Sequence, residues 1–403
     1  MENARTLLLL GGSGQQVVAI EAAKRCGYRT VVCDYLPDNP GQHHADAFYL
    51  VSTTDRDAVL EVARAEGVMG VVAYSSDPAA PTAAYVAESL GLPTNPLSSV
   101  EILSIKTLFR SYLRKEGFAC PQAVGVPVGA SAEQASALVR DLRFPIVVKP
   151  SDSSGSKGVT VLDSIDGLEA ALKKASAFSR NRQLIAEEYI EMTTTHVIGG
   201  DVFVKDGRIC FWGLSNCRRA LSNPLLPIGE SIPIDLSDRV LGRVKATLQD
   251  LVTSLGLRFG ELNVEVIVSR EDVPYVLELG ARAGGGMIPV QFSDISGIDL
   301  VRANVMCAMG DDPGPLDWQA DNQCYATYFL ISDTSGIYRG LWLSPVAEAA
   351  CYRKVPFVEE GAHVERCEHA GHVFGVLFFR FDDAAEMNLM MDNIDDHVKV
   401  FVE

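Results

Sequence analysis

The chain has 403 residues, of which 47% are hydrophobic and 22% charged, as in ordinary soluble α/β proteins of two or three domains. Its formal net charge of −17 argues against a nucleic-acid-binding body, which needs clustered Lys and Arg. An acidic protein can still bind a nucleotide if its few cations converge on one cleft and a divalent metal offsets the remaining charge.

Cysteine usage and hydropathy predict a cytoplasmic location. The nine cysteines are scattered and form no CxxC pair, which is typical of reduced thiols and gives no support to a zinc ribbon. No stretch approaches the roughly 18 apolar residues that a membrane helix needs. The opening segment Met1–Leu10 lacks a signal-peptide cleavage pattern. We therefore expect neither a membrane nor nucleic acid among the partners.

Residues 1–95 alternate strand and helix patterns, which predicts a parallel, Rossmann-like sheet. The expected strands are Thr6–Leu10, Thr30–Asp34, Ala47–Val51 and Gly70–Tyr74, and the expected helices are one that ends at Cys26, Asp55–Glu66 and Pro81–Leu90. The turn Gly11–Gly14 invites comparison with GxGxxG, but Val17 breaks that spacing. Because Asp34 ends the second strand, a dinucleotide site stays an alternative to a structural turn or part of a substrate site.

Two composition changes divide the rest of the chain. The stretch Gly91–Ser99 holds two prolines and predicts a boundary, and a second boundary follows the run of Asp, Pro and Gly that begins at Asp311. After it we expect strands over Cys324–Ile331 and His372–Phe381 and a helix over Asp383–Val398. The predicted fold class is α/β, with a Rossmann-like domain over residues 1–95, an α+β domain over 96–310 and a small α+β domain over 311–403.

A predicted β-hairpin over residues 261–282 carries the clearest pattern of polar side chains. Its first strand, Glu261–Val268, alternates with period two, and its second strand follows the polar turn Ser269–Asp272. The members of one face are Asn263 and Glu265 from the first strand and Glu278, Gly280 and Arg282 from the second.

Antiparallel pairing about this turn places Glu265 directly opposite Glu278, with Cβ atoms about 5 Å apart. Two carboxylates so close on apolar strands repel each other and would take up a proton unless a cation lies between them. Mg²⁺ is the expected cation, because it prefers hard oxygen ligands and usually holds substrate phosphates as well. Arg282 offers a fork for a phosphate or carboxylate oxygen. The alternative is the solvated face of a surface hairpin.

Two further segments have patterns typical of a nucleotide site. The apolar strand Phe144–Lys149 ends in a lysine, which is costly unless it meets an anion, and leads into the Gly- and Ser-rich loop Ser151–Val159. The loop is either a polyphosphate cradle or a linker. The strand Ile185–Ile190 carries Glu187 and Glu188, which either serve an adenine edge or form the acidic face of an edge strand.

Taken in chain order, these patterns resemble the ATP-grasp superfamily. The resemblance depends on Lys106 in Ser104–Thr107, the Pro145–Lys149 strand with its loop, Glu187–Ile190, and Asn263-x-Glu265 followed by Glu278-x-Gly280-x-Arg282. It covers most of the chain, because ATP-grasp ligases carry a Rossmann-like N-terminal domain and often a small C-terminal one. It implies a mobile lid subdomain over about residues 115–187 within the central domain.

The resemblance implies ATP and Mg²⁺ as cofactors, with Mn²⁺ as an alternative metal. The residues in contact with the phosphates would be Lys106, Lys149 and the lid-loop residues Ser153, Ser154, Gly155 and Ser156. The catalytic residues would be Lys149 and Arg282. The base and ribose would be held by Glu187, Glu188, Ile190 and His196, although His196 fits a surface or core position equally. The metal would be held by Glu265 and Glu278, with Asn263 as a third ligand.

One position departs from the family pattern. Many members have Asn two residues after the second metal acid, where this chain has Gly280, and branches similar to the amino-acid ligases tolerate a small residue there. That branch implies a carboxylate–amine ligase that forms an amide through an acyl phosphate. Its substrates would be a small-molecule carboxylate and an amine, with amino acids among the candidates, and a homodimer is left open.

Two other functions stay open beside this one. The first is a biotin-carboxylase- or formyl-phosphate-type ATP-grasp enzyme, and the second is an ATP-binding regulatory protein that has lost turnover. Arg218, Arg219 and the predicted loop Asn223–Pro233 either line an acceptor pocket or lie at the surface.

Overall fold

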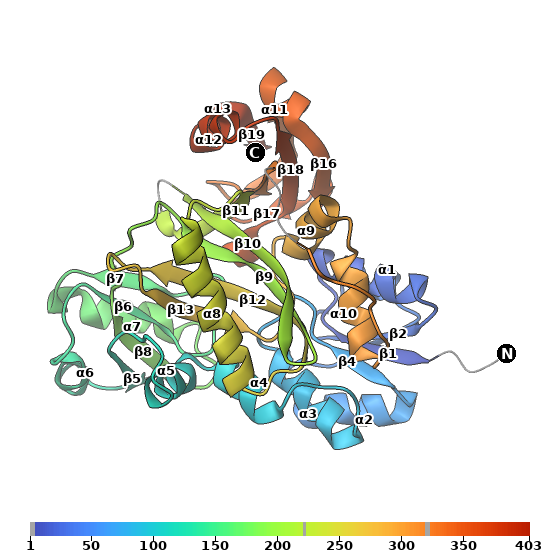
Figure 1. The fold of residues 1–403 in the computed structure, drawn as a ribbon, viewed down its shortest axis with the longest axis horizontal. Coiled ribbons are helices and arrows are strands. Elements are labelled where there is room, and N and C mark those ends of the chain that lie inside the picture. The colour runs from blue at the N-terminus through green and yellow to red at the C-terminus, as the bar shows by residue number, and fades with distance from the viewer. Residues whose placement is uncertain (1–4, 221–222, 319–322) are drawn as a thin grey trace.

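A computed structural model of the protein describes residues 5–220, 223–318 and 323–403. Figure 1 shows the N-terminal elements in blue beside the long central strands, a small sheet in teal on their other side, and the C-terminal elements in red above them. The mixture of one parallel sheet with antiparallel sheets confirms the expected fold class. No helix within the described ranges is long and apolar enough to cross a membrane.

The N-terminal sheet has the order β3-β2-β1-β4 with parallel pairing throughout. Its strands are β1 (Thr6–Leu10), β2 (Arg29–Asp34), β3 (Ala47–Leu50) and β4 (Gly70–Val72), and its helices are η1 (Gly14–Gln16), α1 (Val17–Arg25), η2 (Pro40–His43), α2 (Arg56–Glu66), α3 (Ala80–Leu90) and α4 (Leu97–Ser104). The predicted elements of this region are therefore confirmed, with ends shifted by no more than two residues. Strand β1 is a continuous apolar run because both faces of a parallel sheet are covered.

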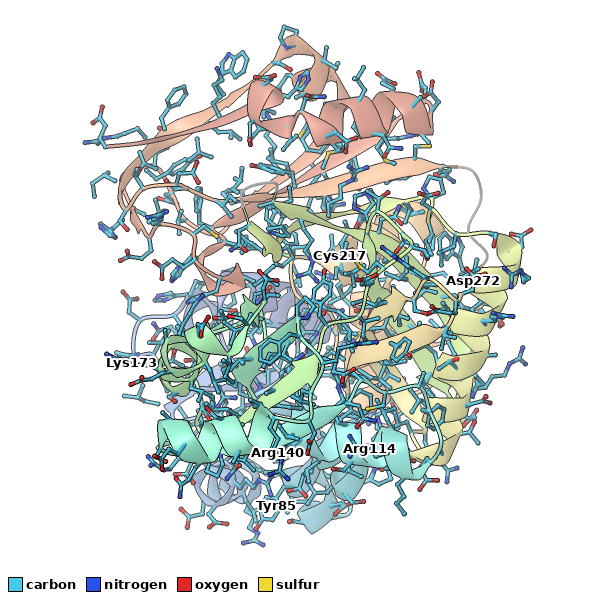
Figure 2. All side chains as sticks on the ribbon, turned by 90° about the vertical axis from the view of Figure 1, so that its left-hand side faces the viewer. Tyr85, Arg114, Arg140, Lys173, Cys217 and Asp272 are labelled. Atoms are coloured by element: carbon cyan, nitrogen blue, oxygen red, sulfur yellow. The ribbon has the colours of Figure 1, made fainter. Side chains whose placement is uncertain are left out.

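A smaller antiparallel sheet has the order β5-β8-β6-β7. Its elements are β5 (Ala123–Pro127), α6 (Ala132–Val139), β6 (Ile146–Pro150), β7 (Thr160–Leu162), η3 (Ile165–Gly167), α7 (Leu168–Ser176) and β8 (Gln183–Glu188), preceded by α5 (Lys106–Lys115). Helices α6 and α7 pack apolar side chains on the sheet. Charged side chains such as Lys173 of α7 and Arg140, which directly follows α6, are exposed (Figure 2). This sheet lies within the predicted lid subdomain.

An eight-stranded antiparallel sheet with the order β13-β12-β9-β10-β11-β14-β18-β16 forms the centre of the molecule. Its first part is built from β9 (Val197–Lys205), β10 (Arg208–Ala220), β11 (Asn223–Ile232), α8 (Asp238–Ser254), β12 (Phe259–Val268), β13 (Pro274–Gly280), α9 (Ile288–Ser296) and α10 (Leu300–Ala308). The segment predicted as a loop over Asn223–Pro233 is wrong: it is the strand β11, paired with both β10 and β14. Helix α8 buries Val244, Leu248 and Leu251 against this sheet, as helical spacing requires.

The C-terminal segment adds three strands to the same sheet and forms a separate three-stranded antiparallel sheet of its own. Its elements are β14 (Cys324–Leu330), β15 (Gly336–Leu343), α11 (Pro345–Ala350), β16 (Cys351–Pro356), β17 (His363–Val364), η4 (Ala370–His372), β18 (Gly375–Phe381), α12 (Ala384–Asp392), α13 (Ile394–His397) and β19 (Val398–Val402). The single helix expected over Asp383–Val398 is wrong, because Asn393 has φ −118° and ψ 32° and separates two helices. The predicted domain boundaries stay a prediction, and the sheet itself crosses the one at residue 311.

Helix α10 packs against both the N-terminal unit and the central sheet. It lies beside α1 in Figure 1 and buries Val301 and Val305 in one cluster with Leu7 and Ile20. This packing brings the loop after β4 to the end of β13, where the hairpin's polar face ends.

Candidate functional site

The predicted hairpin is present with the predicted pairing at its acids. Strands β12 and β13 pair Glu265 with Glu278 and Asn263 with Gly280. A register shift of one residue follows between Glu265 and Val266, on the turn side of the acids, so the irregularity leaves the facing carboxylates in place. The predicted pairing of Glu265 with Glu278 is therefore confirmed.

Each of the two acids has a cation beside it. Glu278 Oε1 lies 3.1 Å from Lys106 Nζ, and Glu265 Oε1 lies 3.4 Å from Nη2 of Arg219 on β10. The Glu278 and Glu265 side chains remain 24% and 32% exposed, so an ion from solvent can reach them. Within the described ranges the second oxygen of each carboxylate accepts no hydrogen bond, which leaves two hard oxygen ligands.

Asn263 adds an amide oxygen to this face. Its Nδ2 donates to Gly200 O at 3.0 Å and to Asp201 Oδ1 at 2.8 Å, which turns its Oδ1 away from Asp201. Asp201 also accepts from the backbone N of Gly284 at 2.7 Å, and burial raises its pKa to about 6. The donor set of two carboxylates and one amide fits Mg²⁺. Among the described residues, no group of three or more His, Cys, Asp or Glu side chains is arranged to hold a metal ion.

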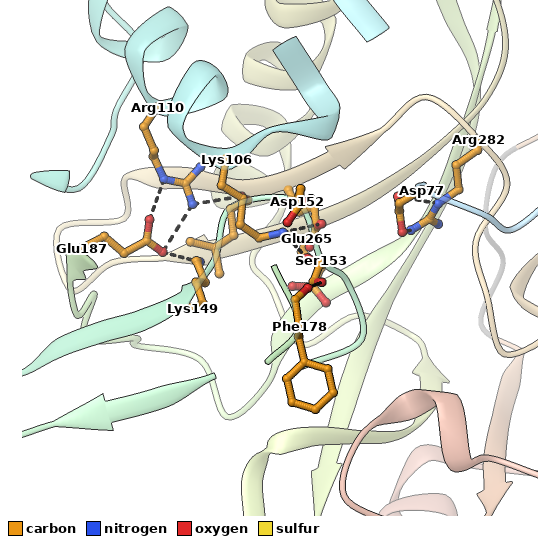
Figure 3. Close-up of polar contacts among 12 residues, drawn as sticks. Asp77, Lys106, Arg110, Lys149, Asp152, Ser153, Phe178, Glu187, Glu265 and Arg282 are labelled. Carbon is orange, nitrogen blue, oxygen red and sulfur yellow. Dashed lines mark hydrogen bonds and ion pairs between the residues drawn. The ribbon is translucent and has the colours of Figure 1, made fainter. Parts of the chain in front are cut away.

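Lys106 joins the hairpin to the Gly- and Ser-rich loop. It is the first residue of α5, and its backbone N donates to Ser151 O at 2.7 Å. Its Nζ donates to Ser153 O at 2.7 Å as well as to Glu278 Oε1 (Figure 3). The predicted phosphate ligand therefore stands between the lid loop and one of the predicted metal ligands.

A buried ionic group lies on the other side of Lys106. The carboxylate of Glu187 accepts a hydrogen bond from Arg110 Nε at 2.9 Å and another from Lys149 Nζ (Figure 3). All three side chains are almost fully buried. We expected the Glu187 carboxylate to take the adenine amine, but in this structure two cations hold it, and the adenine role stays a prediction.

Arg110 was missed by the sequence analysis. It lies one helical turn after Lys106 on α5, so the spacing of four residues places both cations on one helix face. That spacing was the available signal. Nothing in the sequence indicates that its partner is Glu187, because the two residues are 77 positions apart.

The electrostatics of Glu187 follow from its partners. Burial opposes ionisation, but the charges of Arg110 and Lys149 outweigh it and lower the pKa of Glu187 to about 2. Burial also lowers the pKa of Lys149, against the opposing charge of Glu187. The carboxylate is therefore ionised at neutral pH and orients both cations.

Replacing Glu187 by Gln should change how stability depends on pH. Because the folded pKa lies below the ordinary 4.5, ionised Glu187 stabilises the fold above about pH 4.5, and this contribution disappears as the pH falls toward 2. The difference in unfolding free energy between wild type and Glu187→Gln should shrink by about 3 kcal/mol across that window, measured by urea unfolding at several pH values. Glu61→Gln on the exposed face of α2 is the control, and a constant difference for Glu187→Gln would contradict the assignment.

The other residues predicted to hold the base and the ribose are Glu188, Ile190 and His196. The backbone N of Glu188 donates to Gln122 O at 2.9 Å, and its Oε1 accepts from the backbone N of Arg143 at 2.9 Å. Ile190 lies beyond the end of β8, where it is half-buried against the cluster of Val197, Cys217 and Ile267. His196 precedes β9 near the charges of Arg218, and burial lowers its pKa. Its ribose role stays a prediction.

The lid loop is fixed at several points. Ser153 Oγ donates to Phe178 O at 2.6 Å, and Ser156 Oγ donates to Leu225 O at 2.5 Å. Gly155, with φ +66°, accepts from the backbone N of Ala370 at 3.1 Å. The loop therefore contacts both β11 and the C-terminal turn η4.

Arg282 meets a partner that the sequence analysis missed. Its Nε donates to Asp77 Oδ1 at 2.7 Å and its Nη2 to Asp77 Oδ2 at 2.6 Å, while Nη1 donates to Ala283 O at 3.0 Å. Asp77 lies in the loop after the parallel strand β4, where ligands of α/β sheets commonly bind. That position was a signal for Asp77, although nothing local pairs it with Arg282.

The glycine-rich turn after β1 is filled by protein groups. Asp34 Oδ2 accepts from the backbone N of Gly12 at 2.8 Å. Gln16 donates from Nε2 to Tyr74 O at 2.8 Å, and its Oε1 accepts from the backbone N of Ser13 at 2.8 Å. A Cβ at Gly12 would lie 2.0 Å from Asn39 Oδ1. These contacts favour the structural turn over the dinucleotide site.

The sequence of the chain matches a known protein family. A model of the ATP-binding domain of the carbamoyl-phosphate synthase L chain matches residues 106–313. The carbamoyl phosphate synthase large chain of Thermotoga petrophila is 26% identical over 268 residues, which are 64% of this chain and 23% of that protein. The chain thus spans about a quarter of the length of that relative.

Two other proteins are similar over more of their length. The formate-dependent phosphoribosylglycinamide formyltransferase of Synechococcus sp. (strain WH7803) is 30% identical over 284 residues, covering 67% of this chain and 68% of that protein. The crystal structure of the L-amino acid ligase from Bacillus licheniformis superposes with a TM-score of 0.81 at 20% identity, covering 100% of both chains. The protein belongs to the family of the carbamoyl-phosphate synthase L chain ATP-binding domain and so to the ATP-grasp superfamily.

Proposed function

We propose that the protein is an ATP-dependent carboxylate–amine ligase that forms an amide through an acyl phosphate. The observation that carries the proposal is the facing pair Glu265 and Glu278 with Lys106 in contact, in a chain of the ATP-grasp superfamily. A phosphate-binding cation beside two metal-binding carboxylates is the arrangement that phosphoryl transfer needs.

The reaction has two steps. In the first, a carboxylate oxygen of the acid attacks the γ-phosphorus of ATP, the bond to the ADP oxygen breaks, and an acyl phosphate forms. In the second, the amine nitrogen attacks the acyl carbon, the bond to phosphate breaks, and the nitrogen gives up a proton. Both steps depend on positioning and charge more than on covalent catalysis by the protein.

The metal and the nucleotide have proposed ligands. Mg²⁺, when bound, would neutralise phosphate charge beside Glu265, Glu278 and the amide oxygen of Asn263. Lys106 would bind a phosphate oxygen from a place where it already bridges Glu278 and the lid loop. The remaining proposed contacts are Lys149, Ser153, Ser154, Gly155, Ser156, Glu187, Glu188, Ile190 and His196. Mn²⁺ as a substitute metal, a homodimer and a cytoplasmic location stay predictions.

Closing the lid loop would protect the acyl phosphate from water. The loop carries its own contacts to Phe178, Leu225 and Ala370, so its position depends on three separate parts of the fold. Arg282 would face the transferred phosphate or the acyl group with the N–H groups that Asp77 leaves free.

Amino acids are the first substrates to test, because the L-amino acid ligase from Bacillus licheniformis shares the fold over the whole chain. A second candidate is formyl-phosphate chemistry, favoured by the 30% identity to the formate-dependent formyltransferase over two thirds of both chains. In that case the acid is formate, and the amine acceptor is a separate small molecule.

Phosphate release from ATP and Mg²⁺ in a panel of acids and amines tests the proposal. The panel holds free amino acids as both partners, and formate with the same amines as a second arm, with products identified by mass spectrometry. We expect release that depends on both partners, and an amide product. Release no higher than that of Glu278→Gln across the whole panel, with ATP still bound, would favour a non-catalytic ATP-binding protein.

A further inference from the structure

Asp77 joins the N-terminal unit to the polar face of the hairpin. Both of its carboxylate oxygens accept from the Arg282 guanidinium, in a bidentate pair whose side chains are 20% and 8% exposed (Figure 3). The partners are 205 residues apart in the chain. A bidentate Arg–carboxylate pair fixes the orientation of the guanidinium plane as well as its position.

The glycine at position 280 is matched to this pair. Gly280 lies opposite Asn263, on the face that carries Glu278 and Arg282. A Cβ there would lie 3.0 Å from Asp77 Oδ1 and 3.3 Å from Arg282 Cζ. The φ of Gly280 lies outside the left-handed region, so backbone conformation does not require glycine. The requirement is space, which the carboxylate of Asp77 occupies.

Asp77 also meets the lid loop. The Ser154 hydroxyl lies near enough to Asp77 to lower the pKa of its carboxyl, and the charge of Lys106 acts in the same direction. Burial opposes ionisation of Asp77, but Arg282, Ser154 and Lys106 lower its pKa, so it is a carboxylate at neutral pH. One side chain from the loop after β4 therefore contacts the hairpin and the lid loop together.

We propose that Asp77 is a positioning residue that orients Arg282 for the reacting anion, and that glycine at position 280 leaves the space that the Asp77 carboxylate needs. Asp77 holds the Nε/Nη2 edge, and Ala283 O holds one N–H of Nη1. One N–H on each of Nη1 and Nη2 then remains for a two-oxygen anion such as a phosphoryl or carboxylate group. The inference rests on the proposed ligase function, in which Arg282 meets that anion.

The kinetic test compares Asp77→Asn, which keeps the side-chain volume, with Asp77→Ala. We expect kcat for phosphate release to fall about 10–100-fold in both variants, while the KM for ATP changes less than about threefold, because Arg282 would be misplaced and Lys106 would not. Thermal unfolding of each variant verifies that it is folded. A purely structural role would not separate kcat from KM in this way.

The space-filling test uses Gly280→Ala in two backgrounds. Alone it should lower kcat about tenfold, because the new Cβ displaces the Asp77 carboxylate. In the Asp77→Ala background it should lower kcat by less than about twofold further, because the shortest contact of the new Cβ, with Asp77 Oδ1, is then absent. Gly242→Ala in α8, where an added Cβ meets nothing within 4 Å, is the control and should keep wild-type kcat.

The outcomes separate the two proposals. An active wild type with unchanged kcat in both Asp77 variants overturns the positioning role and leaves the ligase function standing. If Gly280→Ala lowers kcat by the same factor in both backgrounds, the proposal that Gly280 makes room for Asp77 is overturned. A wild type without turnover on the full panel overturns the proposed function, and the positioning role falls with it.

Discussion

Glu278→Gln should reduce phosphate release about 10²–10³-fold, the loss that follows removal of one group that stabilises transition-state charge. The amide keeps the shape of the side chain but removes the charge that a divalent ion and Lys106 both use. The Mg²⁺ concentration for half-maximal activity should rise in parallel. The measurement is kcat as a function of Mg²⁺ at saturating ATP. Glu265→Gln should behave alike, because Glu265 is the facing ligand.

The matched control comes from the same hairpin. Glu271 lies exposed in the turn between β12 and β13, where its Oε2 accepts from Ser269 Oγ at 2.8 Å. Glu271→Gln changes the net charge equally but should leave kcat and the Mg²⁺ requirement unchanged. If Glu278→Gln kept more than about a third of wild-type activity at the same Mg²⁺ concentration, the facing carboxylates would not be the metal site.

The facing acids could be predicted from the sequence because the rules that place them are local. Period-two alternation assigns each side chain of a strand to a face, and a short polar turn fixes which residues pair. A different local pattern predicted the parallel N-terminal sheet: short apolar segments, such as Leu7–Leu10, that alternate with helices. The register shift after Glu265 was not predicted: β12 keeps one register with β9, and the shift occurs only in its pairing with β13.

The buried ion pairs of the site could not be predicted from the sequence. Arg110 with Glu187 and Arg282 with Asp77 are pairs between distant segments, and only the assembled fold decides which charged side chains become buried together. A charged residue in the chain is far more often exposed than buried. The predicted single helix after Asp383 failed for a different reason: one residue, Asn393, leaves the helical conformation inside an otherwise periodic segment.

The residues that the sequence analysis missed, Arg110 and Asp77, have the same kind of role in the site. Each is a charged side chain that holds a predicted functional group in position: Arg110 acts on Glu187 and through it on Lys149, and Asp77 acts on Arg282. Motifs identify the groups that would touch the nucleotide. The groups that orient them lie on other elements, so their spacing in the sequence carries no motif.

Arg110→Met should destabilise the fold by about 3–5 kcal/mol, the usual cost of breaking a buried ion pair by removing one partner. Arg110 is 2% exposed, and its loss would leave Glu187 with Lys149 alone and Leu277 O without its donor at 3.0 Å. Arg114→Met, at an exposed position one turn later on the same helix and labelled in Figure 2, should change stability by less than about 0.5 kcal/mol. Adding Glu187→Met to Arg110→Met should cost less than the sum of the single changes, because the uncompensated carboxylate is removed with its partner. Urea unfolding of the four variants at pH 7 measures these differences, and a loss below about 1 kcal/mol for Arg110→Met would mean that Lys149 alone suffices to hold Glu187.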